Sequence, residues 1–334
     1  MTPDQVDEAG FQVLLDHILQ DRGLDCRQYK PRFLRRRFAV RMRALKVQSY
    51  AEYAARLAER DAEYAHLFSA LTINLSYFFR DASLYDSLRE EVLPALLDAR
   101  RRARRLRIWS AGCAGGEEPY SLAMLLDELL GPRRAAWRLH IRATDVDATA
   151  LDQARAGRYS RFSLQGADER YIGKYFSVDG DEYVLAPHIV DMVNFRQADL
   201  MATSAAPACD LILCRNVLIY FRRPQHERLF RLFHRTLPND GVLVIGKTET
   251  LPLSMMHLFR PLNRREHIYS KVPDHIDEET RYVRPRSSPR ATSPSSLPPA
   301  AGMARAGSRL QLGHQPAHPG QADGADDGGV LHPL

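Results

Sequence analysis

A glycine-rich turn followed by two carboxylates is the stretch of this chain best suited to bind a small ligand. Residues 109–121 have the sequence Trp-Ser-Ala-Gly-Cys-Ala-Gly-Gly-Glu-Glu-Pro-Tyr-Ser. A glycine such as Gly112 allows the backbone to approach a ligand closely, and a helix that begins after the turn presents free N–H groups. Glu117 would repel a phosphate here, so a cationic or amino-bearing ligand fits better. S-adenosylmethionine (SAM) carries both a sulfonium and an ammonium group.

The spacing of polar residues excludes several other kinds of site. The turn matches neither G-x-G-x-x-G nor G-x-x-x-x-G-K-[ST]. The sequence shows no Ser-His-Asp, Cys-His or metal-ligand cluster, so we expect no metal. The four cysteines form no C-x-x-C pair, which favours reduced thiols and makes the cytoplasm the expected location.

The elements that position this turn are those of an α/β fold. Short apolar segments alternate with helical stretches and are expected to be parallel strands. They are residues 106–110, 139–144, 210–214 and 241–246. This alternation predicts a doubly wound, Rossmann-like parallel sheet. Between residues 159 and 199, a hairpin signal at Gly180 and an expected strand at 193–195 predict a small antiparallel β insert.

Composition and periodicity divide the chain into three parts. Residues 1–90 show helical periodicity without strand alternation, which predicts an all-α N-terminal domain; residues 50–71 are expected to form one helix. Residues 91–272 are expected to be the SAM-binding domain, with the β insert at about 160–198. Residues 273–334 are rich in Pro, Ser, Gly, Ala and Arg, which predicts a disordered tail.

Polar residues that follow the expected strands are candidates for the ligand site. Asp145 ends the second strand, where a carboxylate can accept hydrogen bonds from ribose hydroxyls, although a helix N-cap is an equally good interpretation. Arg215, Asn216 and Tyr220 follow strand 210–214, beyond whose carboxyl end a ligand should lie. The alternative for Tyr220 is a buried tyrosine whose hydroxyl is satisfied internally.

A third group of polar residues precedes the turn. Asn74, Ser76 and Arg80 have a spacing compatible with a loop folded over a ligand. Asn74 and Ser76 offer neutral hydrogen bonds, and Arg80 offers a planar fork for a carboxylate. The alternative is a helix-terminal cap followed by an exposed arginine.

Taken together, these segments resemble the chemotaxis receptor methyltransferases (CheR). The resemblance covers about residues 10–272. It is carried by blocks at residues 71–81, 112–121, 143–147 and 214–221 and by a weaker block at 246–249. It implies SAM-dependent transfer of a methyl group to glutamate side chains of chemoreceptors for chemotactic adaptation. The products would be glutamate methyl esters and S-adenosyl-L-homocysteine (SAH).

The resemblance also implies roles for individual residues. It assigns catalysis to Arg80 and Tyr220. It assigns cofactor binding to Asn74, Ser76, Arg80, Gly112, Glu117, Asp145, Asp199, Leu200, Arg215 and Asn216. Three positions depart from the family pattern, in which Thr is usual at Ser76, Ser-Thr at Ala114-Gly115, and Asn at Asp199. None of these departures removes a charge that the chemistry needs.

A basic helix predicts an acidic partner. Nine of the residues from Arg27 to Lys46 are Lys or Arg and none is acidic, in a chain of net charge +6. In the family, this region is thought to face the glutamate-rich cytoplasmic methylation region of the receptor. The candidate partner-binding residues are Arg35, Arg36, Arg37, Arg41 and Arg43. The alternative is a solvated basic face. We expect a monomer that meets the membrane only through the receptor.

Two other functions stay open at this point. Nucleic-acid methylation is compatible with the positive charge, but the motif [DNS]-P-P-[YF] is absent and Arg215-Asn216-Val217 stands in its place. We therefore expect no nucleic-acid partner. A SAM-binding regulatory module without turnover would explain the departures from the family pattern, whereas the presence of Arg80 and Tyr220 argues against it.

Overall fold

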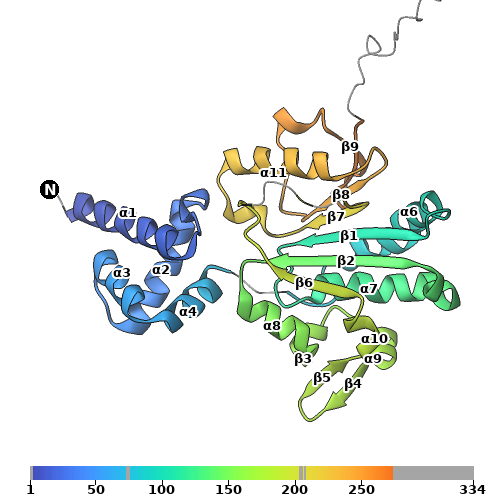
Figure 1. Ribbon diagram of the computed structural model, residues 1–334, viewed down its shortest axis with the longest axis horizontal. Helices are drawn as coiled ribbons and strands as arrows, with labels where there is room; N and C mark the ends of the chain where they lie inside the picture. The colour runs from blue at the N-terminus through green and yellow to red at the C-terminus, as the bar shows by residue number, and fades with distance from the viewer. Residues whose placement is uncertain (1–2, 73–75, 203–205, 207, 274–334) are drawn as a thin grey trace, which may run out of the picture. The chain divides into compact units, whose positions relative to one another are not determined.

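The computed structural model describes residues 3–72, 76–202, 206 and 208–273 (Figure 1). The tail that the sequence predicts to be disordered lies outside the described residues beyond Pro273.

The central element is a seven-stranded sheet with the order β6-β2-β1-β7-β8-β10-β9. Its strands are β1 (Arg105–Ala111), β2 (Arg138–Asp145), β6 (Val193–Gln197), β7 (Leu211–Cys214), β8 (Val242–Ile245), β9 (Phe259–Asn263) and β10 (Ile268–Lys271). Strands β6, β2, β1, β7 and β8 run parallel, and β10 is antiparallel to both β8 and β9. This confirms the predicted α/β fold with a doubly wound sheet.

Alternate side chains of the central strands enter two different hydrophobic cores. On β7, Leu211 and Leu213 belong to one core, whereas Ile212 and Cys214 belong to the other. Because successive side chains of a strand point to opposite faces, both faces of the sheet are buried. The helices that follow the strands are α7 (Glu117–Leu130), α8 (Ala148–Ala156), α10 (Pro187–Val190) and α11 (Arg223–Thr236).

The small antiparallel sheet is present, but one of its strands differs from the prediction. It has the order β3-β5-β4 and consists of β3 (Arg158–Ser160), β4 (Phe176–Asp179) and β5 (Glu182–Leu185), with α9 (Glu169–Tyr175) before β4. The expected third strand at 193–195 is instead part of β6, which pairs in parallel with β2 at the edge of the main sheet. An isolated apolar run does not reveal which sheet it will join, and the prediction was wrong there.

The N-terminal region is helical, as predicted. It contains α1 (Pro3–Arg22), α2 (Pro31–Leu45), α3 (Tyr50–Glu59) and α4 (Asp61–Leu71). Residues 50–71 form two helices instead of the one expected, because Arg60 has extended backbone angles (φ −135°, ψ 96°). Pro31 stands in the first turn of α2, where its missing N–H costs no hydrogen bond. Leu34 and Phe38 of α2 are fully buried.

The segment between the helical region and β1 packs with the sheet. It comprises α5 (Ala82–Ser87), a π-helical turn (Leu88–Val92) and α6 (Leu93–Ala99). Leu84, Leu88 and Leu96 are buried in the same core as Leu211 and Leu213 of β7. The expected domain limits, including the one at residue 90, stay a prediction.

Candidate active site

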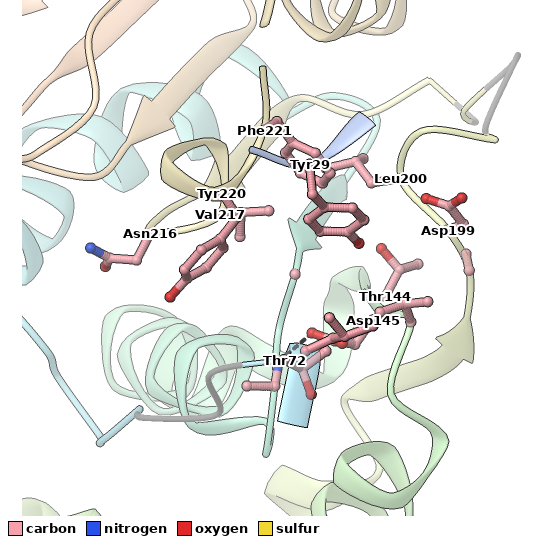
Figure 2. A pocket seen from close by; sticks show the side chains of 15 residues that line it. Tyr29, Thr72, Thr144, Asp145, Asp199, Leu200, Asn216, Val217, Tyr220 and Phe221 are labelled. Carbon is pink, nitrogen blue, oxygen red and sulfur yellow. Dashed lines mark hydrogen bonds between the residues drawn. The ribbon is translucent and has the colours of Figure 1, made fainter. Parts of the chain in front are cut away.

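An open cavity, whose empty space of about 640 Å³ includes adjoining solvent, lies beyond the carboxyl ends of β1, β2, β6 and β7. Such positions bind ligands in open α/β sheets. The cavity brings together six of the predicted site residues: Gly112, Asp145, Asp199, Leu200, Asn216 and Tyr220. Figure 2 shows Tyr29 between Tyr220 and Asp199, with Asp145 and Thr144 on the opposite side from Phe221.

The turn after β1 has a backbone that only glycine adopts readily. Gly112 has φ +81°, and its N–H donates to the carbonyl oxygen of Thr144 at 2.8 Å. A Cβ at this position would lie 2.4 Å from Cγ2 of Val217. Gly112 therefore allows two loops, one after β1 and one after β7, to approach each other closely at the floor of the cavity.

Asp145 is oriented by backbone groups of this same turn. Its Oδ2 accepts the N–H of Ala114 at 2.8 Å, and its Oδ1 accepts the N–H of Asp147 at 3.0 Å. Burial raises the pKa of Asp145, although these backbone hydrogen bonds favour the charged form. The helix N-cap that was the alternative for Asp145 is instead Asp147, which accepts the N–H groups of Thr149 and Ala150. Asp145 is thus left facing the cavity.

Asp199 and Leu200 form another wall of the cavity, after β6. The Oδ1 of Asp199 accepts the N–H of Met201 at 2.8 Å. Burial is the main cause that raises the pKa of Asp199, and Asp25 adds to it, whereas Arg228 opposes it.

The loop after β7 carries Asn216 and Tyr220 and is held by a buried carboxylate. Glu249 is 3% exposed and accepts the N–H groups of Asn216, Val217 and Leu218 at 2.7–3.0 Å. Asn216 has φ +58°, a left-handed conformation that asparagine tolerates better than most residues. Glu249 thus stabilises a strained turn that places Asn216 and Tyr220 at the cavity.

A second cavity of about 440 Å³ adjoins the first and is lined by Ser76 and Arg80. The two cavities share Gly112, Ala114 and Asn216. The guanidinium of Arg80 lies 5.9 Å from the ring centre of Tyr77. Arg80 and Tyr220 therefore line two adjoining cavities, with the shared residues between them.

Arg215 lines the second cavity but is bound mainly inside the protein. Its side chain is 3% exposed and donates to Glu118 Oε2 at 3.1 Å and to Asp81 Oδ2 at 2.6 Å. It also donates to the carbonyl oxygen of Arg80 at 2.8 Å. Arg215 thereby fixes the backbone of Arg80, and its predicted contact with the cofactor stays a prediction.

Glu117 lies beneath the glycine turn and lines neither of the two cavities. It is 4% exposed, and its Oε2 has no hydrogen-bond partner among the described residues. Burial raises the pKa of Glu117 to about 7. A hydrogen bond with the hydroxyl of Ser76 favours the charged form and offsets part of this rise. Asn74, the remaining predicted cofactor residue, lies outside the described residues.

Three residues that contribute to the site escaped the sequence analysis. Tyr29 lines the cavity from the N-terminal region, and so does Thr72, whose hydroxyl donates to Asp147 Oδ2 at 2.7 Å. No sequence signal identifies Tyr29, because its neighbours across the cavity are distant in sequence, whereas Thr72 lies within the family-like block at residues 71–81. Glu249 lies within the weakest of the family-like blocks, which was the one available signal.

The predicted partner-binding arginines of α2 differ in their environments. Arg41 makes a two-pronged ion pair with Glu63, which is 4% exposed. Arg35 pairs with Asp7 at 3.0 Å and with Glu8. Arg36 and Arg43 are exposed, and the guanidinium of Arg37 lies 5.5 Å from the ring centre of Phe33. Of the five, Arg36 and Arg43 are the most accessible to a partner.

Comparisons with known proteins identify the family. Residues 74–268 match the model "CheR methyltransferase, SAM binding domain", and residues 9–72 match "CheR methyltransferase, all-alpha domain". The chain belongs to the CheR methyltransferase family. The cavity beyond β1, β2, β6 and β7 is therefore part of a SAM-binding domain, and the predicted all-α region is the all-alpha domain of this family.

Curated relatives are similar to this chain over most of their length. A chemotaxis protein methyltransferase of Listeria monocytogenes is 35% identical over 251 residues, 75% of this chain and 93% of the relative. A chemotaxis protein methyltransferase of Salmonella typhimurium is 31% identical over 72% of this chain and 84% of the relative. Among solved structures, SAM-bound CalS10, an amino pentose methyltransferase from Micromonospora echinaspora, aligns with a TM-score of 0.30 at 15% identity, covering 51% of this chain and 52% of that one. That alignment adds nothing to the assignment.

Among the described residues, no helix is both long enough and apolar enough to cross a membrane.

Proposed function

We propose that this methyltransferase esterifies glutamate side chains of chemoreceptors with the methyl group of SAM. The observation that carries the proposal is that the two adjoining cavities have lining residues in common. Asp145 and Asp199 line the larger cavity, and Arg80 lines the smaller one, while Asn216 belongs to both. A guanidinium beside a cofactor cavity is suited to a carboxylate acceptor, because its planar fork matches the two oxygens.

The reaction needs no general base. SAM, when bound, supplies an electrophilic methyl group. A glutamate carboxylate is already ionised near neutral pH, so its oxygen would form the new C–O bond without first losing a proton. The S–CH₃ bond would break with its electron pair going to sulfur, and SAH would be the leaving group. The protein is thus required to align the two partners and to exclude water from the reacting centre.

The described residues supply those tasks in the proposal. Asp145 accepts hydrogen bonds from the ribose hydroxyls. Glu117 lines neither cavity and, when ionised, attracts the ammonium of the methionine end through its charge. Arg80 orients the incoming carboxylate, and the hydroxyl of Tyr220 donates to it. Burial raises the pKa of Tyr220, so its hydroxyl stays protonated and able to donate at neutral pH.

The acceptor is assigned from charge and from the relatives. The accessible Arg36 and Arg43 of α2 give this helix a cationic face that would attract a glutamate-rich helix in a salt-dependent way. The relatives from Listeria monocytogenes and Salmonella typhimurium are named chemotaxis protein methyltransferases. We therefore propose the methylation region of a chemoreceptor as the partner of this face.

The proposal is tested by incubating the full chain with methyl-labelled SAM and receptor-bearing membranes, followed by mild base. We expect labelled methanol, because carboxyl esters hydrolyse under these conditions. Membranes whose receptor has Gln in place of the methylated Glu residues are the control and should yield none. Base-stable label would contradict the proposal and move the acceptor to nitrogen or nucleic acid. SAM binding without label would favour a regulatory module.

A further inference from the structure

A short segment of the N-terminal region is hydrogen-bonded to the loop that carries Tyr220. Tyr29 and Phe221 form an antiparallel β-bridge. The N–H of Lys30 donates to the carbonyl oxygen of Tyr220 at 2.9 Å, and the N–H of Arg222 donates to the carbonyl oxygen of Gln28 at 2.9 Å. These two hydrogen bonds flank the bridge and fix the backbone of Tyr220 from outside the sheet.

Aromatic contacts reinforce this bridge on the side-chain level. The ring of Phe33 packs against the ring of Tyr220 with 4.9 Å between their centres and 36° between their planes. The rings of Tyr29 and Phe221 are 4.7 Å apart. Tyr29 also lines the cavity, whereas Phe33 does not. Phe33 therefore touches Tyr220 without being part of the cavity wall.

The first part of the Tyr220 loop, residues 216–218, is held by Glu249 and not by the N-terminal region. The carboxylate of Glu249 accepts N–H groups of residues 216–218 but does not reach Tyr220. Tyr220 ends a 3₁₀ turn (Leu218–Tyr220), after which the chain becomes extended at Phe221. Its ring thus depends on contacts from the N-terminal region for its orientation, and Phe33 is the ring that packs on it within the described residues.

We infer that Phe33 is a positioning residue for Tyr220, so that helix α2 of the all-alpha domain sets the orientation of the tyrosine at the methyl-transfer position. Phe33 is the third residue of α2, and the fourth, Leu34, is fully buried. The helix is therefore anchored at the point where it meets Tyr220. Because an orientation error near the reacting atoms slows the reaction, Phe33 should affect turnover more than cofactor binding.

Only the expected effect of Phe33 on turnover rests on the proposed function; the contact between Phe33 and Tyr220 does not. The same helix carries Arg36 and Arg43, which we propose as receptor contacts. A receptor bound to α2 would then meet the helix that orients Tyr220, which would couple substrate binding to the alignment of the site.

The test compares Phe33→Ala and Phe33→Tyr with the unchanged chain. We expect Phe33→Ala to lower kcat for receptor methylation by roughly tenfold. It should leave KM for SAM and the Kd of SAH within twofold. Amide hydrogen exchange of residues 217–222 should become faster. Phe33→Tyr retains the ring and should restore both kcat and slow exchange. Val13→Ala, at an exposed apolar position of α1, is the matched control and should change nothing.

The outcomes separate this inference from the proposed function. Unchanged exchange at residues 217–222 in Phe33→Ala, or a failure of Phe33→Tyr to restore it, overturns the inference. An equal loss of kcat and of SAH affinity also overturns it, because that would mark a general defect of the cavity. If the unchanged chain methylates no receptor, the proposed function fails, while the exchange measurement still decides whether Phe33 holds the Tyr220 loop.

Discussion

Asp145 and Glu117 are buried carboxylates whose partners among the described residues are neutral. Asp145 accepts two backbone N–H groups, and one oxygen of Glu117 accepts nothing. Burial raises the pKa of both, because neither gains a nearby cationic side chain to offset the loss of water. A ligand that brings hydroxyl groups and an ammonium would supply what these two carboxylates lack.

The ionisation of Glu117 predicts a pH dependence of stability. Its pKa rises from the ordinary 4.5 to about 7 in the folded protein. Between these pH values the folded state holds a proton that the unfolded state has lost, so the free energy of unfolding falls as pH rises. We expect a fall of about 3 kcal/mol from this group between pH 4.5 and pH 7. It should be absent in Glu117→Gln and present in the control Glu91→Gln, whose side chain is exposed.

Urea unfolding of the ligand-free protein at pH 5 and pH 8 measures this effect. If Glu117→Gln and the unchanged chain lose the same stability between these pH values, Glu117 is not the group responsible. Under the proposed role of Glu117, SAM affinity should also increase as pH rises through 7, because only the ionised carboxylate attracts the ammonium. Calorimetry with Glu117→Gln should show no such increase.

Removal of the Tyr220 hydroxyl tests the proposed contact with the substrate carboxylate. A hydrogen bond to a charged group contributes about 1.5–3 kcal/mol, so Tyr220→Phe should lower kcat by roughly 10- to 100-fold. The Kd of SAH should stay within twofold. Tyr269→Phe, on β10 outside both cavities, is the matched control and should be fully active. An unchanged kcat in Tyr220→Phe would remove the hydroxyl from the mechanism.

Individual elements are joined by buried ion pairs at the end of the sheet opposite to the cavity. Asp210 precedes β7 and is fully buried. Its carboxylate accepts the backbone N–H and two side-chain nitrogens of Arg107 on β1 at 2.9–3.1 Å, and Nε of Arg100 after α6 at 3.0 Å. Asp210 therefore sets the position of β7 relative to β1, and with it the loop that carries Tyr220.

Neutralisation of Asp210 should destabilise this junction. Asp210→Asn removes the charge that Arg107 and Arg100 share, although Arg100 keeps its pair with Asp240, so it should reduce the free energy of unfolding by about 2 kcal/mol. Burial alone would raise the pKa of Asp210, but the hydrogen bonds from Arg107 and Arg100 lower it overall. This contribution is thus complete above the ordinary value of 3.8 and is lost as pH falls below it.

Chemical denaturation at pH 7 and at pH 3 checks both statements. Asp98→Asn is the control, because Asp98 is 73% exposed and pairs with the exposed Arg101. It should change stability by less than about 0.5 kcal/mol. An Asp210→Asn variant as stable as this control at pH 7 would show that the buried ion pairs are not needed for the junction.

At the scale of the whole described chain, the cofactor cavity is shared between the helical region and the sheet. Tyr29 and Thr72 line it from the helical region, and Asp145 and Asp199 line it from the sheet. A ligand that contacts both parts stabilises the arrangement in which they are joined. SAH at 100 times its Kd should therefore increase the free energy of unfolding by about 2.7 kcal/mol.

Calorimetric unfolding with and without SAH, together with hydrogen exchange, tests this coupling. Peptides that contain Tyr29 should become protected along with peptides of β2, because Tyr29 lines the cavity together with Thr144 and Asp145 of β2. Adenosine triphosphate is the control ligand and should protect neither, since its anionic phosphates would stand where the proposal places the ammonium-bearing methionine end. Protection confined to the sheet would show that the helical region does not take part in binding.

Much of the fold could be predicted from local patterns. Apolar runs at 106–110, 139–144 and 210–214 predicted central strands, because strands buried on both faces must be apolar along their length. The turn at 112–117 and the carboxylate of Asp145 could be assigned for the same reason, since parallel strands end at one edge of the sheet. The assignment of residues 193–195 to the insert was wrong, because edge pairing depends on neighbours and not on composition.

The sequence by itself therefore determined the fold class, the family and the edge of the sheet where the site lies. These properties follow from periodicity and from short motifs, which are encoded by residues close together in the chain. Only the tertiary structure decided that Tyr29 and Phe33 meet the Tyr220 loop, that Arg215 binds Glu118 and Asp81, and that Arg41 binds Glu63. Each of these contacts joins segments that are distant in sequence, and the burial that determines their energetics exists only once the chain has folded.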